Sequence, residues 1–265
     1  MRLREMLPMS AIALALLALA GCHNSRNQSP YFYSTQQDVP KFKSDAATPH
    51  AIAQNEVALA QEYLKMGKYD LALERLQKAI KTEPSSPDGY TVLGLLYERI
   101  NRPELAEANY AKAVKLAPDK GDMLNNYGAW LCRSGHPAEA DVQFRKALSD
   151  PFYHTPGVAM LNASICAAKA GKLELAEGYG RQLLAVDPNN LQGLQNMADI
   201  SFQRGQYLQA RGFVERFLAT GAYSPPLLDL GARIEDKLGD AAAARGYRDR
   251  IAAGAPQPQP PPNGN

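Results

Sequence analysis

Histidine and cysteine are the residues in this chain that most readily bind a metal or serve a catalytic reaction. The 265-residue sequence has four histidines and three cysteines. The histidines are His23, His50, His136 and His154, and no two of them stand at metal-ligand spacing on one helix. The sequence also contains no glycine-rich phosphate-binding loop and no nucleophile elbow. We therefore expect a protein that is not an enzyme and that needs no metal or cofactor.

The charge of the chain gives no argument for binding nucleic acid. The formal net charge of the whole sequence is +2. Residues 1–21 contain Arg2, Arg4 and Glu5, so removing this segment lowers the net charge by one, to +1. A nearly neutral protein does not attract a phosphate backbone through its overall charge.

An apolar run near the N-terminus predicts export. Residues 9–20 are too few to span a bilayer as a helix, and they end in Leu19-Ala20-Gly21-Cys22. This ending resembles a bacterial lipobox, whose cysteine is acylated and whose preceding peptide is removed. The resemblance implies a signal peptide over residues 1–21 and a lipid on Cys22, while an ordinary secretory signal that happens to contain a cysteine is the alternative. His23 stands where many inner-membrane lipoproteins have aspartate, so the resemblance favours the periplasmic face of the outer membrane.

Two segments lack helical periodicity. Residues 22–50 are polar and contain three prolines, so we interpret them as the lipidated cysteine followed by a disordered tether. Within the tether, the cluster Tyr31-Phe32-Tyr33 either docks on a partner or on the folded domain, or has arisen by chance. Residues 255–265 are rich in proline, and we expect them to be disordered or to form polyproline II.

Residues 90–118 show the pattern on which the chain between these segments is built. Gly94, Ala106 and Ala113 are small enough to let two helices approach closely, and Pro118 would end the second helix. This pattern resembles the tetratricopeptide repeat, a 34-residue pair of antiparallel helices. The turn between the helices recurs along the chain at intervals of 34 residues, with one interval of 36. The turn residues are Gly67, Asn101, Gly135, Gly171, Gly205 and Gly239.

The recurrence predicts an all-α fold, a tetratricopeptide repeat superhelix of six helix–turn–helix repeats over residues 51–254. We place the repeats at 53–86, 87–120, 121–154, 157–190, 191–224 and 225–254. Each pair of helices would bury its apolar face on its neighbours, and the last repeat would serve as a polar cap. A fold of this kind offers a long concave surface, which suits binding.

The first helix of each repeat should line that surface. The predicted groove residues are Val57, Gln61, Leu64, Leu95, Arg99, Asn126, Leu161, Asn162, Ile165 and Asn196. The apolar members could equally belong to the core, because helical spacing does not distinguish a groove from a core. The three asparagines share one repeat position, which resembles the asparagine ladder of some peptide-binding members of this family. The alternative is that each asparagine bridges helices internally.

Two cysteines fall in the first helices of successive repeats. Cys132 and Cys166 stand two repeat positions apart, which is about 3 Å along a helix axis. A bridge requires Cα atoms within about 7 Å of each other, so it is geometrically plausible. Because the lipobox implies the oxidising periplasm, we predict a disulfide, with two buried free thiols as the alternative.

The whole arrangement is similar to the type IV pilus biogenesis lipoproteins called PilF or PilW. The shared features are the lipobox, the polar tether, the six repeats, the cysteine pair and the run Asn125-Asn126-Tyr127-Gly128. Members of that family act as pilotins, which help the pilus secretin to reach the outer membrane and to assemble there. The resemblance implies a lipid-anchored scaffold that binds a peptide or an amphipathic segment of the secretin, and we expect a monomer. The alternatives are another periplasmic scaffold, in cell-wall synthesis or outer-membrane protein assembly, and an enzyme whose repeats carry a substrate.

Overall fold

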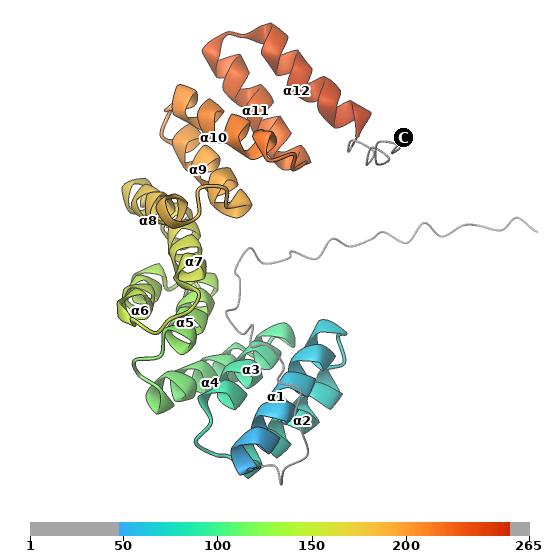
Figure 1. Cartoon of the computed structure of the whole chain (residues 1–265), viewed down its shortest axis with the longest axis vertical. Coiled ribbons are helices and arrows are strands. Elements are labelled where there is room, and N and C mark those ends of the chain that lie inside the picture. Colours follow the sequence, from blue (N-terminus) through green and yellow to red (C-terminus); the bar gives the residue numbers. More distant parts are fainter. Residues whose placement is uncertain (1–47, 255–265) are drawn as a thin grey trace, which may run out of the picture. The chain divides into compact units, whose positions relative to one another are not determined.

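The computed structural model describes residues 48–254. These residues form twelve α-helices and no β-strand, and the helices follow one another in antiparallel pairs (Figure 1). The helices are α1 (Pro49–Lys65), α2 (Tyr69–Thr82), α3 (Pro87–Arg99), α4 (Pro103–Leu116), α5 (Gly121–Arg133), α6 (Pro137–Ser149), α7 (Pro156–Lys169), α8 (Leu173–Val186), α9 (Leu191–Gln203), α10 (Tyr207–Ala219), α11 (Pro225–Leu238) and α12 (Ala241–Ala253). The predicted all-α tetratricopeptide fold is confirmed.

The start of the first helix differs from the prediction. The helix α1 begins at Pro49, inside the segment that the sequence analysis assigned to the tether at 22–50. The side chain of Thr48 caps it, because Oγ1 accepts a hydrogen bond from the backbone N–H of Ala51 at 3.2 Å. The proline ring fits the first turn of a helix, where its missing N–H is not needed. The assignment to the tether was therefore wrong for these two residues, since Pro49 starts a helix.

Several predicted features lie outside the described residues. They are the signal peptide at 1–21, the lipidated Cys22, the aromatic cluster Tyr31-Phe32-Tyr33 and the tail at 255–265.

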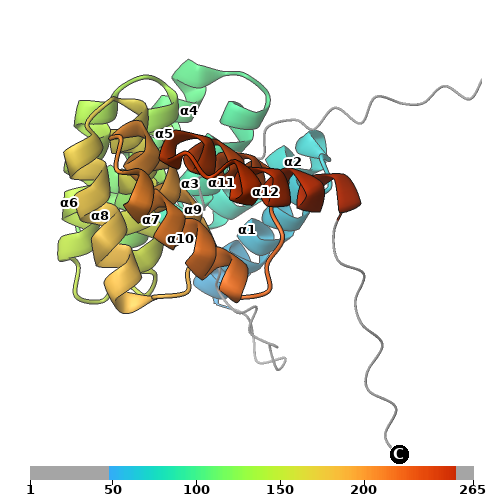
Figure 2. The same cartoon turned by 90° about the horizontal axis from the view of Figure 1, so that it is seen from above.

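The helices form two layers. Each odd-numbered helix contacts the next odd-numbered helix, and each even-numbered helix contacts its own partner and the odd-numbered helix that follows. In Figure 1, for example, α6 and α8 lie on the left of α5 and α7, and Figure 2 shows them on the same side from above. We call the side of the odd-numbered helices that faces away from the even-numbered ones the inner face.

Glycine sets the distance between the two helices of a pair. A Cβ atom added to Gly94 in α3 would lie 3.0 Å from the ring of Tyr110 in α4. A Cβ atom added to Gly128 in α5 would lie 2.9 Å from the ring of Phe144 in α6. Both rings are almost completely buried. The close approach that the sequence predicted at Gly94 therefore serves to seat an aromatic ring.

The two-residue insertion between α6 and α7 is held by a carboxylate and filled by an aromatic ring. Asp150 accepts hydrogen bonds from the backbone N–H groups of Gly121 at 2.9 Å and Phe152 at 2.8 Å. These two bonds hold the pKa of Asp150 below its usual value. Tyr153 packs into a buried cluster with Leu124, which closes the space between the pairs. Phe152 is left 80% exposed.

The structure joins Cys132 of α5 to Cys166 of α7 by a disulfide, the pairing that their repeat positions predict. The two Cα atoms are 5.8 Å apart, which suits a disulfide without a shift of the backbone. Cys166 is buried in the core cluster that contains Trp130 and Tyr179, and Cys132 packs against it. The bridge therefore ties the third pair of helices to the fourth beside their shared core.

Three glycines occupy one repeat position without a packing reason. Gly178, Gly212 and Gly246 are spaced by 34 residues and lie in the middle of α8, α10 and α12. A Cβ atom added to any of them would meet no atom within 4 Å. Gly180 differs, because its added Cβ would collide with the side chain of Met197.

Substituting alanine at these three positions should stabilise the protein. We expect Gly178→Ala, Gly212→Ala and Gly246→Ala each to raise the free energy of unfolding by about 1 kcal/mol, since alanine loses less backbone entropy in a helix. Urea unfolding followed by far-ultraviolet circular dichroism measures the change. The matched control is Gly180→Ala in α8, which should destabilise by about 1–3 kcal/mol through overpacking. Equal effects at Gly178 and Gly180 would contradict this account.

The disulfide should be present in protein recovered from the periplasm. After denaturation without reductant, neither Cys132 nor Cys166 should react with a maleimide. Because the bridge closes a loop of 34 residues, the double variant Cys132→Ala, Cys166→Ala should lose about 3–4 kcal/mol of unfolding free energy. Reduction of the wild-type protein should cause a similar loss. Labelling of both cysteines before reduction would show that the bridge does not form.

Candidate binding surface on the inner face

The inner face is built from the odd-numbered helices, because their outward positions recur every three or four residues. Ten residues were predicted to line it, and the structure divides them into two groups. The first group is buried: Val57 and Leu161 are 6% and 4% exposed, and Asn126 and Asn162 have no exposed surface. These positions are where successive odd-numbered helices pack on each other. The assignment of these four residues to an accessible groove is therefore corrected.

The second group reaches solvent. Arg99 is exposed, and the other members are half-buried. Those members are Gln61, Leu64, Leu95, Ile165 and Asn196. Leu64 packs against the core of the first two pairs, while Leu95 and Ile165 pack against the core around Trp130. These three side chains are therefore the accessible margin of the core, and they make the inner face partly apolar.

The asparagines do not form a ladder that faces a ligand. The amide of Asn162 donates a hydrogen bond to the side-chain oxygen of Asn125 at 3.0 Å, which links α7 to α5. The amide of Asn196 donates to the hydroxyl of Ser164 at 2.7 Å, which links α9 to α7. These bonds bridge successive odd-numbered helices and satisfy buried polar groups. The internal role that the sequence left open is therefore the one that the structure shows for Asn162 and Asn196.

One ion pair crosses the inner layer between the second and third pairs. The guanidinium of Arg133 donates to both carboxylate oxygens of Glu98, at 2.5 and 2.7 Å. The hydroxyl of Tyr110 donates to the same carboxylate at 3.3 Å. A bidentate pair of this kind fixes both side chains in place. Arg133 therefore positions α5 on α3.

Two aspartates stand at matching positions at one edge of the inner face. Asp88 and Asp122 are each the second residue of an odd-numbered helix, α3 and α5 respectively. Burial raises the pKa of Asp88 above its ordinary value of 3.8, and the charge of Asp122 raises it further. His50 and Lys120 act in the opposite direction. Ionising Asp88 is therefore unfavourable in the folded protein, in spite of its place in the first turn of a helix.

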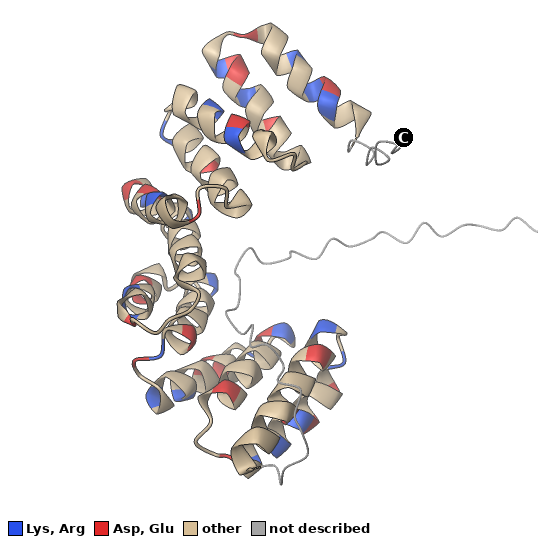
Figure 3. Ribbon diagram, viewed as in Figure 1, with Lys and Arg blue, Asp and Glu red and all other residues tan. Residues whose placement is uncertain are grey.

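The chemistry of the inner face changes along the chain. Figure 3 shows acidic and basic residues interspersed along the described helices, but α7 has only one charged residue, Lys169. In the last two pairs the guanidinium of Arg233 lies 4.6 Å from the centre of the Phe202 ring, a cation–π contact. Burial raises the pKa of Asp199, and Arg233 opposes this rise. The inner face is thus partly apolar over the first four pairs and polar over the last two.

The sequence analysis missed Asp88, Asp122 and the contact between Phe202 and Arg233. The two aspartates were detectable, because they stand 34 residues apart at one repeat position. The contact between Phe202 and Arg233 had no such signal, since it joins different positions of two repeats.

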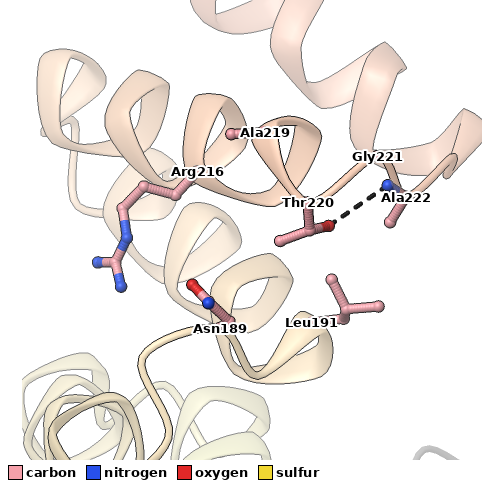
Figure 4. Close-up of a pocket in the computed structure, with 7 residues that line it drawn as sticks. All are labelled: Asn189, Leu191, Arg216, Ala219, Thr220, Gly221 and Ala222. Atoms are coloured by element: carbon pink, nitrogen blue, oxygen red, sulfur yellow. Dashed lines mark hydrogen bonds between the residues drawn. The ribbon is translucent and has the colours of Figure 1, made fainter.

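The largest hollow does not lie on the inner face. It has a volume of about 670 Å³ and is lined by Asn189, Leu191, Arg216, Ala219, Thr220, Gly221 and Ala222 (Figure 4). Arg216 there donates a hydrogen bond to the carbonyl oxygen of Pro188 at 2.7 Å, and Thr220 accepts one from the N–H of Ala222. These polar groups bond to the loops beside them and do not converge on a common point in the hollow.

Two findings limit the chemistry of the described part of the chain. Within residues 48–254, no three histidine, cysteine, aspartate or glutamate side chains gather where they could hold a metal ion. In the same range, none of the helices is both long enough and apolar enough to cross a bilayer.

Stacked helix pairs with a continuous inner face define a tetratricopeptide repeat protein. The tetratricopeptide repeat family model matches residues 57–121. The solved structure of PilW, described as a widely conserved type IV pilus biogenesis factor, is 31% identical to this chain. The similarity covers 78% of this chain and 96% of PilW, with a TM-score of 0.71.

Two comparisons with a Pseudomonas aeruginosa protein agree. The type IV pilus assembly protein PilF is 26% identical over 236 residues, which cover 89% of each sequence. The solved structure of PilF is 25% identical and has a TM-score of 0.69, covering 78% of this chain and 94% of PilF. The chain therefore belongs to the family of type IV pilus biogenesis proteins that includes PilF and PilW.

Proposed function

We propose that this protein is a non-catalytic scaffold for type IV pilus biogenesis and acts as a pilotin. In this role it binds the pilus secretin and helps it to reach the outer membrane and to form its ring there. The observation that carries the proposal is the partly apolar inner face at Leu64 and Leu95, on a chain related to a pilus assembly protein over most of its length. A pilotin needs a surface that holds one segment of its client, and this face provides such a surface.

The partner segment would lie across the odd-numbered helices of the first pairs. Leu64 at the end of α1 and Leu95 in the middle of α3 each keep part of their side chain in contact with solvent. Covering them with apolar side chains of the secretin would remove this surface from water, which is favourable by about 25 cal/mol per Å². An apolar groove that receives a helical or extended segment is a recurrent mode of peptide recognition.

The proposal also includes a lipid on Cys22 and attachment to the periplasmic face of the outer membrane. Its support is the sequence Leu19-Ala20-Gly21-Cys22 after an apolar run. Residues 23–47 would then connect the lipid to α1. A connection of this length would let the helix pairs reach a secretin subunit while the lipid stays in the membrane.

Acidic residues at the two leucines should prevent secretin binding. We expect Leu64→Glu with Leu95→Glu to reduce binding by at least tenfold, because the partner segment would have to bury two charges. A pull-down of the purified secretin on the immobilised protein measures the effect. Recovery of a cell-wall synthesis protein instead of the secretin from solubilised membranes would favour the alternative scaffold.

The matched control uses leucines on the opposite layer. Leu71 in α2 and Leu105 in α4 are 38% and 46% exposed, so Leu71→Glu with Leu105→Glu should leave secretin binding unchanged. Circular dichroism checks that both double variants remain helical. If the inner-face variant unfolds, Leu64→Ala with Leu95→Ala removes the apolar surface without introducing a charge. Unchanged binding by a folded inner-face variant would refute the proposed site.

Loss of the acylated cysteine should release the protein from the membrane. We expect Cys22→Ser to remain a full-length precursor that takes up no radioactive palmitate, and secretin rings should then be fewer or misplaced. Membrane fractionation and palmitate labelling of cells measure the two effects. Cys132→Ser is the matched control, since it removes a cysteine that lies far along the chain from the lipobox. Palmitate labelling of the Cys22→Ser protein would show that the lipid is attached elsewhere.

A further inference from the structure

We infer that the inner face of the first three pairs selects an amphipathic helix whose apolar side is bordered by basic residues on one flank and by acidic residues on the other. The inference rests on the proposed function, since it specifies the segment that the same surface would bind. It follows from an acidic rim, a basic rim and the distance between them. We define the acidic rim as Asp88 and Asp122, and the basic rim as Lys65 and Arg99.

The acidic rim lies at the N-terminal ends of the inner helices. Asp88 and Asp122 are the second residues of α3 and α5, and these two helices are in contact. A carboxylate at such a position usually gains from the helix dipole. Here burial and the neighbouring Asp122 raise the pKa of Asp88, so a pair of ionised carboxylates at this edge is a cost to the folded protein. A cationic side chain of a partner, placed between the two carboxylates, would offset that cost.

The basic rim lies at the C-terminal ends of the same layer. Lys65 and Arg99 are the last residues of α1 and α3. The ammonium of Lys65 lies 2.7 Å from the carboxylate of Glu62, but both side chains are more than half exposed, so this pair is weak. Arg99 is exposed and can meet an acidic side chain of a partner. Arg133, which follows in the same row, is engaged by Glu98 and stays part of the scaffold.

The apolar margin lies between the rims. Leu95 stands between Asp88 and Arg99 on α3, and Leu64 stands beside Lys65 on α1. The eleven residues from Asp88 to Arg99 span about 16 Å along the helix axis. A helix with its side chains is about 10–12 Å wide, so a helix lying across α1, α3 and α5 would have one rim on each flank. A single extended strand, about 5 Å wide, would not reach both rims at once.

The two rims also set the direction of the partner. Turning an amphipathic helix end for end, with its apolar side still on Leu64 and Leu95, exchanges its left and right flanks. Only one of the two directions then places the basic flank on Asp88 and Asp122 and the acidic flank on Arg99. The inner face would therefore distinguish the direction of the bound segment as well as its apolar pattern.

Three synthetic helical peptides test this inference. All three carry the same leucine stripe. The first has lysine along one flank and glutamate along the other, the second has lysine along both flanks, and the third has glutamate along both. Fluorescence anisotropy with the full-length Cys22→Ser protein, at low and at physiological salt, gives the affinities. We expect the first peptide to bind roughly tenfold more tightly than either of the others at low salt, and the difference to shrink as salt is added.

Exchanging the rim charges should change the order of the peptides. Arg99→Glu should weaken the glutamate-flanked peptide and strengthen the lysine-flanked one, while Asp88→Lys with Asp122→Lys should do the reverse. Circular dichroism checks the fold, and Asp88→Asn with Asp122→Asn provides a milder variant of the acidic rim. Lys112→Glu in α4 is the control, since it changes a charge on the even-numbered layer and should leave the order unchanged.

The outcomes separate this inference from the proposed function. If the three peptides bind equally and the rim variants change nothing, while Leu64→Glu with Leu95→Glu prevents binding, the rims do not select the partner and the apolar site stands. If the peptides bind as well to the Leu64→Glu, Leu95→Glu protein as to the wild type, they do not use the inner face. That result would overturn both the inference and the proposed site.

Discussion

The close approach of the two helices within each pair is the constraint on which the rest of the structure depends. It exists where a glycine of one helix faces an aromatic ring of the other, as at Gly94 with Tyr110 and at Gly128 with Phe144. A pair held this closely still has an apolar face that it cannot bury alone, so it must stack on its neighbours. The layers, the core clusters and the inner face all follow from repeating this contact along the chain.

The odd-numbered helices carry two demands at once. They pack on one another along the layer, and they also form the inner face that a partner can reach. The first demand takes the middle of each helix, where Asn125 and Asn162 share a buried hydrogen bond. What remains for binding is the margin of the core, at residues such as Leu95, and the ends of the helices, at residues such as Asp88 and Arg99. The accessible chemistry of this fold is therefore concentrated in two rims and a narrow apolar strip.

This division explains how far the sequence could predict the structure. Helix pairs, turns and repeat boundaries were readable, because small residues, glycines and prolines stand at fixed positions and act locally. The burial of Val57 and Leu161 was not readable, since a period of 3.6 residues identifies a helix face but not the angle at which the next helix crosses it. Pro49 was misread for another reason. A proline is compatible with a break and with a first helical turn, and only the cap at Thr48 decides between them.

The inner face changes from partly apolar to polar after α7, close to where the third and fourth pairs are joined most firmly. Cys132 and Cys166 link α5 to α7 covalently, and Tyr153 fills the insertion between α6 and α7. In a repeat array each pair contacts only its neighbours, so two stretches of the inner face can differ in chemistry without disturbing each other. A firm joint between them keeps both stretches on one scaffold. The contact between Arg233 and Phe202 therefore belongs to a surface whose chemistry is independent of the one at Leu64 and Leu95.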